Sequence, residues 1–388
     1  MLDKLRTRIM ILSDGYLPGK NYGGPVTSLK NLVDNCSDKF EFYIITSDRD
    51  LNCRETYKGI KDGLNSVGRA KVFYLSNDNF SKSYLETIFN SIKPKLIYQN
   101  SFFSYKSFIL SNYFSNKLRI PILIAPRGEL CNGAYNLKIT KKKIYTKLVN
   151  QYLKLNKRVF FHSTSDEETN AIIKRINILR NNVIQIKNIS SGIYENGVAS
   201  FKEEGKLNLI FLSRIQVKKN LKYAIKIVNQ IKNVEITFDI YGPIENKKYW
   251  DECKILIKKS PKNINIKYSG QVDQQDVKAT FSRYHAFFFP TFSENYGHVI
   301  VEAMQASCIM ILSDQTPWND INNSGGGFAL SLSSTQEYVD VLNHLGWLNN
   351  QEFQLLKQKN IDYVNKKIDD YSVVRKYYKY FQKLADKT

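Results

Sequence analysis

The sequence predicts an α/β protein built from two doubly wound, Rossmann-like parallel sheets. The chain has 388 residues, which suits two domains, and 43% of them are hydrophobic, enough to bury two cores. Short β-branched or aromatic runs alternate with segments of helical periodicity, which is typical of βαβ units and parallel sheets. The alternation stops at a polar stretch and then restarts, so we expect two sheets facing a central ligand cleft.

Each expected strand is a short apolar run that ends at a polar or glycine-containing turn. Seven are expected in the first half of the chain: Arg8–Leu12, Glu41–Thr46, Ala70–Leu75, Lys95–Tyr98, Ile120–Ala125, Val159–Ser163 and Val183–Lys187. Five are expected in the second half: Leu207–Leu212, Glu235–Tyr241, Ile264–Tyr268, Ala286–Pro290 and Cys308–Leu312. The polar stretch Ser190–Gly205 is expected to link the two halves.

The expected domains are residues 1–195 and 196–368, followed by a terminal segment, residues 369–388. Within that segment, Tyr371–Leu384 is an aromatic-rich stretch of helical periodicity. An amphipathic helix must bury its apolar face, so we expect this helix to pack back toward the first domain.

Charge and cysteine usage limit the classes of partner and compartment. The net charge is +21, and residues 101–160 hold 12 Lys and Arg against a single acid, Glu129. Such a local basic face suits nucleic acid, an anionic bilayer or a phosphate-bearing substrate. The five cysteines are widely spaced without a C-x-x-C pair, which favours free thiols over disulfides or a zinc site. No apolar stretch approaches the roughly 20 residues that a membrane-spanning helix needs.

The most informative segment runs from Pro290 to Trp318. An apolar strand ends at Pro290, a polar loop follows, and Gly297 opens a segment with helical periodicity. A loop at a helix N-terminus presents unpaired N–H groups, which suit a phosphate. Glu294 in the loop and Glu302 on the helix can contact opposite ends of one elongated ligand. The alternative is a helix cap and a solvated glutamate.

Two further segments have the composition of a phosphate-binding site. Arg214 follows the first strand of the second half, and Lys219 precedes the next helix. An Arg and a Lys at a strand's carboxyl end can neutralise a diphosphate, although solvated surface charge is the alternative. Gly23 and Gly24 join the first strand to its helix and would let backbone N–H groups approach a ligand, or simply form a tight turn. The pattern is neither G-x-G-x-x-G nor a P-loop.

Asp48-Arg49-Asp50 matches the D-x-D motif with which some sugar-nucleotide enzymes bind a metal. No matching cluster of histidines or carboxylates accompanies it, so we interpret it as a surface loop and expect no metal.

A helix is expected over residues 137–158, with apolar and basic residues on adjoining faces. Ile144, Leu148, Tyr152 and Leu155 share one face, and Lys143, Lys147, Lys154 and Arg158 line its flank. This pattern suits a helix lying in an anionic membrane interface, or a core-packed helix with a solvated basic face.

Taken together, these motifs resemble those of retaining glycosyltransferases of the GT-B fold, in glycosyltransferase family 4. Glu294 to Glu302 matches the family's E-x7-E motif, and Arg214 with Lys219 matches its Arg/Lys pair. The stretches Ser47–Leu51, Ala125–Leu130 and Ser313–Trp318 are similar to segments of polysaccharide-building members.

The resemblance implies a role for each matched residue. Arg214 and Lys219 would hold the diphosphate of a nucleoside-diphosphate sugar. Glu294 and the backbone N–H groups of Asn295, Tyr296 and Gly297 would bind the donor sugar. Glu302 would accept hydrogen bonds from the ribose, while Gly23 and Gly24 would approach the diphosphate from across the cleft. Arg127 stands in the loop where many members place a histidine, and we expect it to contact sugar or phosphate.

The function implied is transfer of a sugar, with retained configuration, to a saccharide or lipid-linked saccharide acceptor for a surface polysaccharide. We expect a cytoplasmic protein, peripheral on the inner face of the membrane, without metal or other cofactor, because cations and helix amides can stabilise the leaving diphosphate. Tyr249 and Trp250 are expected near the base.

A GT-B epimerase or phosphorylase is the alternative. A nucleic-acid binder would use the same charge, but no recognisable module supports it, so no nucleic-acid partner is expected.

Overall fold

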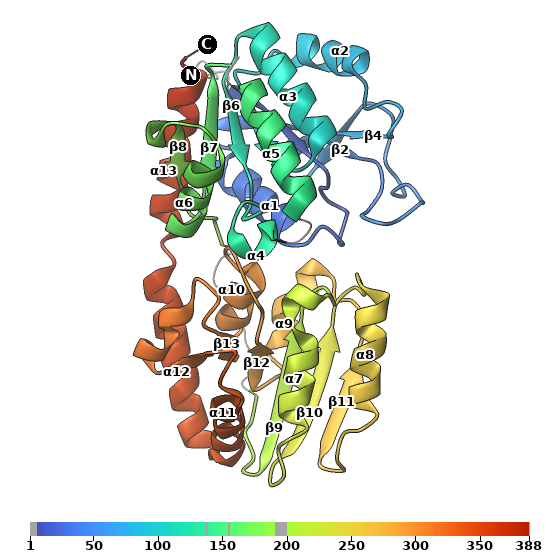
Figure 1. The fold of residues 1–388 in the computed structure, drawn as a ribbon. Coiled ribbons are helices and arrows are strands. Elements are labelled where there is room, and N and C mark those ends of the chain that lie inside the picture. The colour runs from blue at the N-terminus through green and yellow to red at the C-terminus, as the bar shows by residue number, and fades with distance from the viewer. Residues whose placement is uncertain (1–5, 137–138, 154–155, 191–199, 388) are drawn as a thin grey trace. The chain divides into compact units, whose positions relative to one another are not determined.

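The computed structural model describes residues 6–136, 139–153, 156–190 and 200–387. The chain divides into two compact units (Figure 1). Unit 1 comprises Met1–Ile189 together with Asp370–Thr388, and unit 2 comprises Ser190–Asp369. The expected boundary at residue 195 and the linker glycines Gly192 and Gly197 lie outside the described residues, as do Lys154 and Leu155 of the expected basic helix.

Unit 1 contains an eight-stranded sheet in the order β3-β4-β2-β1-β5-β6-β7-β8. All neighbouring strands are parallel except β3 and β4. The strands are β1 (Thr7–Ser13), β2 (Phe40–Ser47), β3 (Leu64–Val67), β4 (Ala70–Leu75), β5 (Leu96–Asn100), β6 (Ile122–Ala125), β7 (Val159–Ser163) and β8 (Val183–Gln185). The helices are α1 (Gly24–Cys36), α2 (Lys82–Ile92), α3 (Tyr105–Leu118), α4 (Asn132–Tyr135), α5 (Ile139–Leu153), α6 (Asp166–Arg175) and α13 (Asp370–Ala385).

Two hydrophobic clusters cover the two faces of this sheet, because successive strand residues point to opposite sides. In β1, Met10 and Leu12 pack with α2, α3 and α6, whereas Ile9 and Ile11 pack with α1 and α13. A strand buried on both faces reads as a continuous apolar run, which is why β1 was recognisable in the sequence.

The terminal helix α13 is part of unit 1, where it packs against α1 and β5. Its buried residues recur at helical spacing: Val373, Tyr377, Phe381 and Leu384. The Phe381 ring has no exposed surface and lies 5.6 Å from the Phe40 ring and 5.7 Å from the Tyr98 ring, centroid to centroid. The aromatic residues noted in the sequence therefore complete the core on this face of the sheet.

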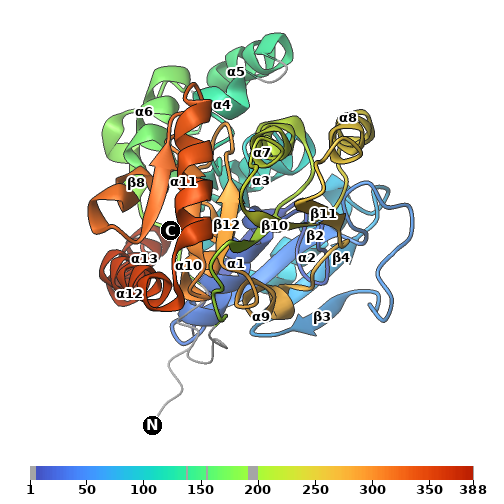
Figure 2. The same cartoon turned by 90° about the horizontal axis from the view of Figure 1, so that it is seen from below.

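Unit 2 contains a six-stranded, fully parallel sheet in the order β11-β10-β9-β12-β13-β14. The strands are β9 (Lys206–Leu212), β10 (Glu235–Tyr241), β11 (Ile264–Tyr268), β12 (Ala286–Phe289), β13 (Ile309–Ser313) and β14 (Gly327–Leu330). The helices are α7 (Leu221–Val228), α8 (Lys247–Ile257), α9 (Val277–Phe281), α10 (His298–Gln305), α11 (Thr335–Trp347) and α12 (Asn350–Lys367). Figure 2 shows α7, α8 and α11 on one face and α9, α10 and α12 on the other.

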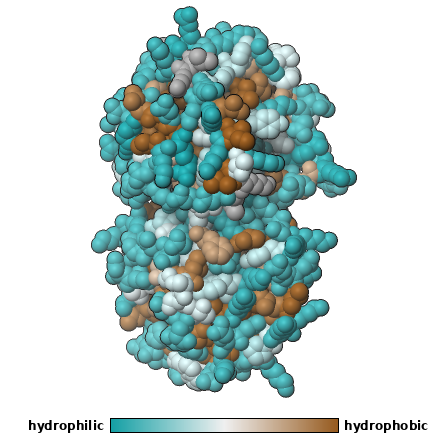
Figure 3. Space-filling view, viewed as in Figure 1, coloured by the Kyte–Doolittle hydropathy of each residue, from teal (hydrophilic) through white to brown (hydrophobic). Residues whose placement is uncertain are grey.

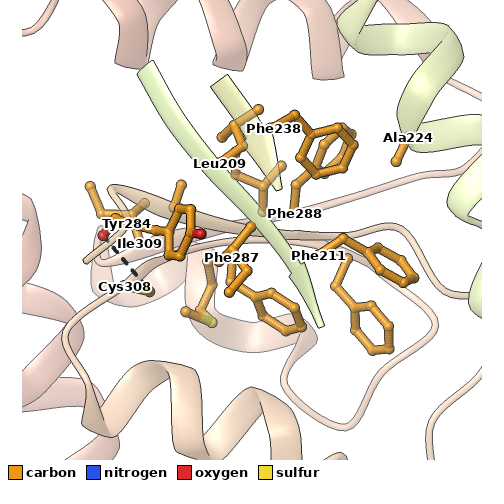
Figure 4. Close-up of a cluster of buried hydrophobic side chains, with 14 of the residues drawn as sticks. Leu209, Phe211, Ala224, Phe238, Tyr284, Phe287, Phe288, Cys308 and Ile309 are labelled. Carbon is orange, nitrogen blue, oxygen red and sulfur yellow. Dashed lines mark hydrogen bonds between the residues drawn. The ribbon is translucent and has the colours of Figure 1, made fainter. Parts of the chain in front are cut away.

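The core of unit 2 is built around the aromatic strand β12. Phe288 lies 6.1 Å from Phe238 of β10 (Figure 4). Phe287 and Phe289 stack with ring centroids 5.0 Å apart. Adjacent residues of a strand face opposite sides of the sheet, so three consecutive phenylalanines serve both faces. The strand is completely buried, and its carboxyl end leads directly into the loop that carries Glu294.

All twelve expected strands are present, with ends that shift by one or two residues, and two further strands were not predicted. β3 is an exposed edge strand without an apolar run, and it forms by antiparallel pairing with β4. β14 begins at Gly327, after two other glycines, a composition that favours a loop. Both strands depend on pairing with a partner strand, which local sequence does not encode.

Each sheet has one point where the strand order reverses. In unit 1 the reversal lies between β1 and β5, and in unit 2 it lies between β9 and β12. The helices that follow two such strands lie on opposite faces of the sheet, and ligands of open α/β sheets bind at the carboxyl ends of these strands.

We expect Phe381→Ala to destabilise unit 1 by about 3–5 kcal/mol, because it leaves a cavity between α13 and the sheet. All three tryptophans lie in unit 2, so urea unfolding followed by circular dichroism reports both units while tryptophan fluorescence reports unit 2 alone. Tyr371→Ala, on the same helix but 75% exposed, is the control and should change stability by less than about 0.5 kcal/mol. Equal unfolding of the two variants would show that α13 contributes little to unit 1.

Candidate functional site

The reversal point of unit 2 brings together the loops that follow β9 and β12. Asn220 donates its side-chain N–H to the carbonyl of Pro290 at 2.9 Å, and the backbone N–H of Phe292 donates to the carbonyl of Lys218, also at 2.9 Å. The Thr291 hydroxyl donates to the same Lys218 carbonyl at 3.1 Å. These bonds hold the residues around Lys219 against the residues around Glu294.

Lys219 and Glu294 form an ion pair between these two loops. Only 10% of the Lys219 side chain and 12% of the Glu294 side chain is exposed, and the Lys219 ammonium also lies 5.4 Å from the centre of the Phe289 ring. A charge pair so far removed from water is costly unless both charges are compensated, and it interacts strongly with any further charge placed beside it. The structure therefore joins two residues that lie 75 positions apart in the sequence.

Arg214 lies in the loop after β9 and does not contact Glu294. Its guanidinium pairs with Glu245, in the loop after β10, at 3.2 Å. About a third of each of these two side chains is exposed. The two loops meet because Gly242 has a φ of 129° and approaches the carbonyl of Ser213 so closely that a Cβ would lie 2.0 Å from that oxygen.

The loop between Glu294 and α10 contains Asn295, Tyr296 and Gly297. Gly297 has a left-handed φ of 74°, and a side chain there would lie 2.8 Å from the Ile300 Cδ1. The loop is held from the segment after β13: the Trp318 indole N–H donates to the carbonyl of Tyr296 at 2.6 Å. The backbone N–H of Glu294 similarly donates to the Gln315 carbonyl at 3.2 Å. The stretch Ser313–Trp318 thus supports the E-x7-E segment.

Glu302 lies in the second turn of α10 and is only 5% exposed. Its carboxylate accepts a hydrogen bond from the Gln274 side-chain N–H at 2.6 Å. Burial raises the pKa of Glu302 from 4.5 to about 7, and the Gln274 bond and the nearby Lys278 ammonium only partly oppose that shift. Glu302 is therefore a buried carboxyl group with unfavourable solvation at neutral pH, on the helix that follows the loop of Glu294.

In unit 1, Gly23 and Gly24 lie where the β1 loop meets α1. Gly23 has a φ of 65° and precedes the helix, whose second residue is Pro25. The same loop is braced by Asp50, whose carboxylate accepts backbone N–H bonds from Lys20 at 2.8 Å and from Asn21 at 3.1 Å. The D-x-D segment is thus more than a surface loop.

The other carboxylate of the D-x-D segment, Asp48, is buried and pairs with its neighbour Arg49 at 2.7 Å. Both carboxylates are therefore engaged in contacts within unit 1. Within the described part of the chain, no group of three or more His, Cys, Asp or Glu side chains could hold a metal ion. The five cysteines, all described, are free thiols, as the sequence predicts.

Arg127 is held by a polar network in unit 1. Its guanidinium donates to the Asn100 side chain at 2.8 Å, the Asn188 side chain at 2.6 Å and the Tyr98 hydroxyl at 2.9 Å. Its φ of 55° is unusual for a residue with a side chain and indicates a backbone held by its surroundings. Most of its hydrogen-bonding capacity is thus used within the protein.

The network around Arg127 continues to a buried histidine. The Tyr98 hydroxyl lies 2.8 Å from the Nδ1 of His162, whose Nε2 lies 2.8 Å from the carbonyl oxygen of Ile186. Burial, assisted by the Arg127 charge, lowers the pKa of His162 to about 3, so its imidazole is neutral at physiological pH. This histidine orients Arg127 through Tyr98 and is itself shielded from solvent.

Several residues that complete these arrangements were not predicted from the sequence. Glu129 accepts hydrogen bonds from the Ser101 hydroxyl at 2.8 Å and the Phe102 backbone N–H at 2.6 Å, and its burial raises its pKa. The sequence feature that could have indicated Glu129 is its position as a single acid among basic residues. Glu245 could have been found as the acid at the next strand's carboxyl end. No feature of the sequence indicates Gln274, because this residue contacts Glu302 only where α9 packs on α10.

Tyr249 and Trp250, expected near a base, are 7% and 8% exposed residues of α8. The Tyr249 hydroxyl accepts the backbone N–H of Lys222 at 2.8 Å, and the Trp250 ring packs 5.0 Å from the Tyr268 ring. They form part of the core of unit 2, because α8 turns its aromatic face toward the sheet.

We expect Glu302→Gln to stabilise unit 2 increasingly as the pH rises from 4.5 to 7. The native carboxyl binds its proton more tightly in the folded than in the unfolded state, so ionisation above pH 4.5 costs stability until the folded pKa is reached. The gain should approach, as an upper bound, about 3 kcal/mol above pH 7. Urea unfolding followed by tryptophan fluorescence at pH 5 and pH 8 measures it, with the exposed Glu235→Gln as the control. A gain that does not depend on pH would contradict this origin.

Residues 195–368 match the family model described as glycosyl transferases group 1. No curated protein matches the chain significantly by sequence. Among solved structures, the Anabaena protein HepE in complex with UDP and glucose is similar, with a TM-score of 0.73, 14% identity, and coverage of 97% of this chain and 100% of that chain.

Two further structures are similar over nearly the whole chain. Sucrose-phosphate synthase from Thermosynechococcus elongatus has a TM-score of 0.71 and 12% identity, with coverage of 99% and 100% of the two chains. WaaG, a glycosyltransferase involved in lipopolysaccharide biosynthesis, has a TM-score of 0.66 and 11% identity, with coverage of 95% and 98%. The chain therefore has the GT-B fold, and the family model of glycosyl transferases group 1 matches most of its second unit.

Proposed function

We propose that this protein is a retaining glycosyltransferase that moves a sugar from a nucleoside-diphosphate sugar to a saccharide acceptor. The observation that carries the proposal is the buried Lys219–Glu294 pair at the reversal point of the unit 2 sheet, with Arg214 on a neighbouring loop. Support comes from the group 1 family match and from the similarity to HepE, which was crystallised with UDP and glucose.

In the proposed donor site, Lys219 and Arg214 bind the diphosphate. In the structure each of these cations contacts one carboxylate. A diphosphate carries more negative charge than a carboxylate, and its oxygens can accept hydrogen bonds from both cations. Glu294 then accepts hydrogen bonds from hydroxyls of the donor sugar, helped by the backbone of Asn295, Tyr296 and Gly297. Glu302 accepts hydrogen bonds from the ribose hydroxyls. This diol supplies a hydrogen-bond donor in addition to Gln274.

The proposed reaction is a displacement on the sugar's anomeric carbon. The bond from that carbon to the diphosphate oxygen breaks, and a bond to the acceptor's hydroxyl oxygen forms on the same face. The acceptor's proton passes to the departing phosphate oxygen, so the second product is the nucleoside diphosphate. Lys219 and Arg214 stabilise the negative charge on the leaving group, and we propose that no metal is required.

We further propose a lipid-linked acceptor, a role in surface polysaccharide synthesis and a peripheral position on the inner face of the cell membrane. The supporting feature is the α5 surface, which we define as Ile144, Leu148 and Tyr152 with the neighbouring Lys143 and Lys147. Ile144 is 59% and Leu148 61% exposed, which is unusual for large apolar residues on one helix face. In the described part of the chain, no helix is long and apolar enough to cross a membrane.

The donor site is tested by incubating the protein in EDTA with a panel of UDP-, GDP- and ADP-sugars and measuring release of the nucleoside diphosphate. We expect release from one donor, reduced about 100-fold or more in Glu294→Gln and Arg214→Ala, because each removes a charged contact to the transition state. Lys226→Ala, an exposed cation on α7, should retain full release.

Other results of this assay would reject the proposal. If no nucleoside diphosphate binds by calorimetry, the donor site is wrong. Release that needs added metal would contradict the metal-independent mechanism. An isomerised sugar formed without any acceptor would instead identify an epimerase.

We expect the α5 surface to bind vesicles that contain phosphatidylglycerol. Ile144→Ser with Leu148→Ser should weaken co-sedimentation about tenfold or more, because two apolar side chains no longer enter the interface. Ile173→Ser, on α6 and 38% exposed, is the control and should bind as the parent does. Equal binding of both proteins would place the membrane contact elsewhere.

A further inference from the structure

A pocket of about 410 Å³ lies beside α5 in unit 1, outside every residue assigned a role above except the flanking lysines. Its lining comes from α5, α4 and the end of α6: Tyr135, Lys143, Thr146, Lys147, Asn150, Gln151, Arg175 and Asn177. Three of these residues are cationic and none is acidic. The pocket is thus a concave, positively charged site, unlike a surface where charges of both signs alternate.

The polar groups at the base of the pocket are hydrogen-bonded to one another. Asn150 donates to the carbonyl of Arg175 at 2.8 Å and accepts from the backbone N–H of Asn177 at 3.1 Å. The Tyr135 hydroxyl donates to the Thr146 hydroxyl at 3.2 Å. These contacts anchor the end of α6 and α4 against α5. The floor of the pocket is therefore rigid before any ligand arrives, which lowers the entropic cost of binding.

The cations around this floor are placed for an anionic ligand. The Arg175 guanidinium lies 4.4 Å from the centre of the Tyr135 ring and uses one N–H group to donate to the Asn132 side chain at 2.7 Å. Stacking on the ring fixes the plane of the guanidinium, and its remaining N–H groups suit the oxygens of a phosphate. Lys143 and Lys147, one turn apart on α5, are exposed and add mobile charges to the opposite wall.

The pocket adjoins the apolar part of the α5 surface. Lys143 and Lys147 are each followed by an exposed apolar residue, Ile144 and Leu148, on the next strip of the same helix. On the face shown in Figure 3, hydrophobic and hydrophilic side chains accordingly lie next to each other over α5. A ligand that combines an anionic group with an apolar chain can contact both strips at once.

We propose that this pocket is a specific binding site for a phosphate monoester or diphosphate group. Arg175 binds two oxygens of the group through its fixed guanidinium, and Lys143 and Lys147 neutralise the remaining charge. A doubly charged group is favoured over a phosphodiester, because three cations converge without an acid to offset them. The diphosphate that joins a saccharide acceptor to its lipid is one such group, an identification that rests on the proposed function, whereas the site itself does not.

The test compares two kinds of phosphatidylcholine vesicle with equal surface charge, one containing phosphatidic acid and the other phosphatidylglycerol. We expect the protein to bind the phosphatidic acid vesicles about tenfold more tightly, because only that lipid carries a phosphate monoester. Lys147→Ala and Arg175→Lys should each remove most of this preference. Lys141→Ala, also on α5 but outside the pocket, should lower binding to both vesicles alike and keep the preference.

A second arm identifies the source of the phosphate group. Inorganic pyrophosphate is titrated into the protein and into Lys147→Ala by calorimetry; a loss of affinity in the variant together with equal vesicle binding would assign the site to a soluble phosphate. Lys147→Ala leaves Arg214 and Lys219 unchanged, so this loss reports on the pocket. The proposal is overturned if the vesicles are not distinguished and Lys147→Ala leaves pyrophosphate binding unchanged. Nucleoside diphosphate release, measured in parallel, shows separately whether the donor site works.

Discussion

The constraint on which this structure depends is the common direction of its strands. In unit 2 all six strands run parallel, and in unit 1 only β3 runs against its neighbour. Every crossover must then return over a face of the sheet, so the loops that follow the strands all emerge at one edge. Residues far apart in sequence meet there, as Lys219 and Glu294 do. The polar residues of the candidate donor site are held by buried aromatic strands that cannot shift without opening the core.

Among the residues that the structure describes, buried charges such as Lys202 and Glu168 are compensated, whereas Glu302 of the candidate site is compensated only in part. Lys202, only 1% exposed, donates to the backbone carbonyl of Glu203 and to two carbonyls at the end of α11. Glu168, fully buried, accepts from Thr164 and from the Gly128 backbone. Glu302 has a single hydrogen-bond donor in the described part of the chain, Gln274, and its pKa is raised because burial removes water from the carboxylate. Such a group is destabilising to the fold and is expected where a ligand supplies the remaining hydrogen bonds.

The two anion sites proposed for this protein bind their ligands through different interactions. In unit 2 a lysine is buried and paired before the ligand arrives, so binding exchanges one strong interaction for another and favours a ligand of defined shape. In unit 1 the lysines of the pocket are exposed, and specificity comes from the stacked Arg175 and a floor of internally satisfied polar groups. The first arrangement suits catalysis on a diphosphate, and the second suits reversible capture of a charged group at an interface.

The sequence by itself determined the fold class, twelve of the fourteen strands in the described part of the chain and the helix-opening loop at Gly297, because runs buried on both faces and glycines with positive φ leave a local signature. It also indicated which residues we propose for the donor site. Tertiary structure alone decided the partners: Lys219 contacts Glu294, Arg214 contacts Glu245, and Arg127 is enclosed by Asn100, Asn188 and Tyr98. The edge strands β3 and β14, Gln274 beside Glu302 and the pocket at α5 were likewise decided there. Each of these depends on side chains from separate elements meeting in space, and no spacing along the chain encodes such a meeting.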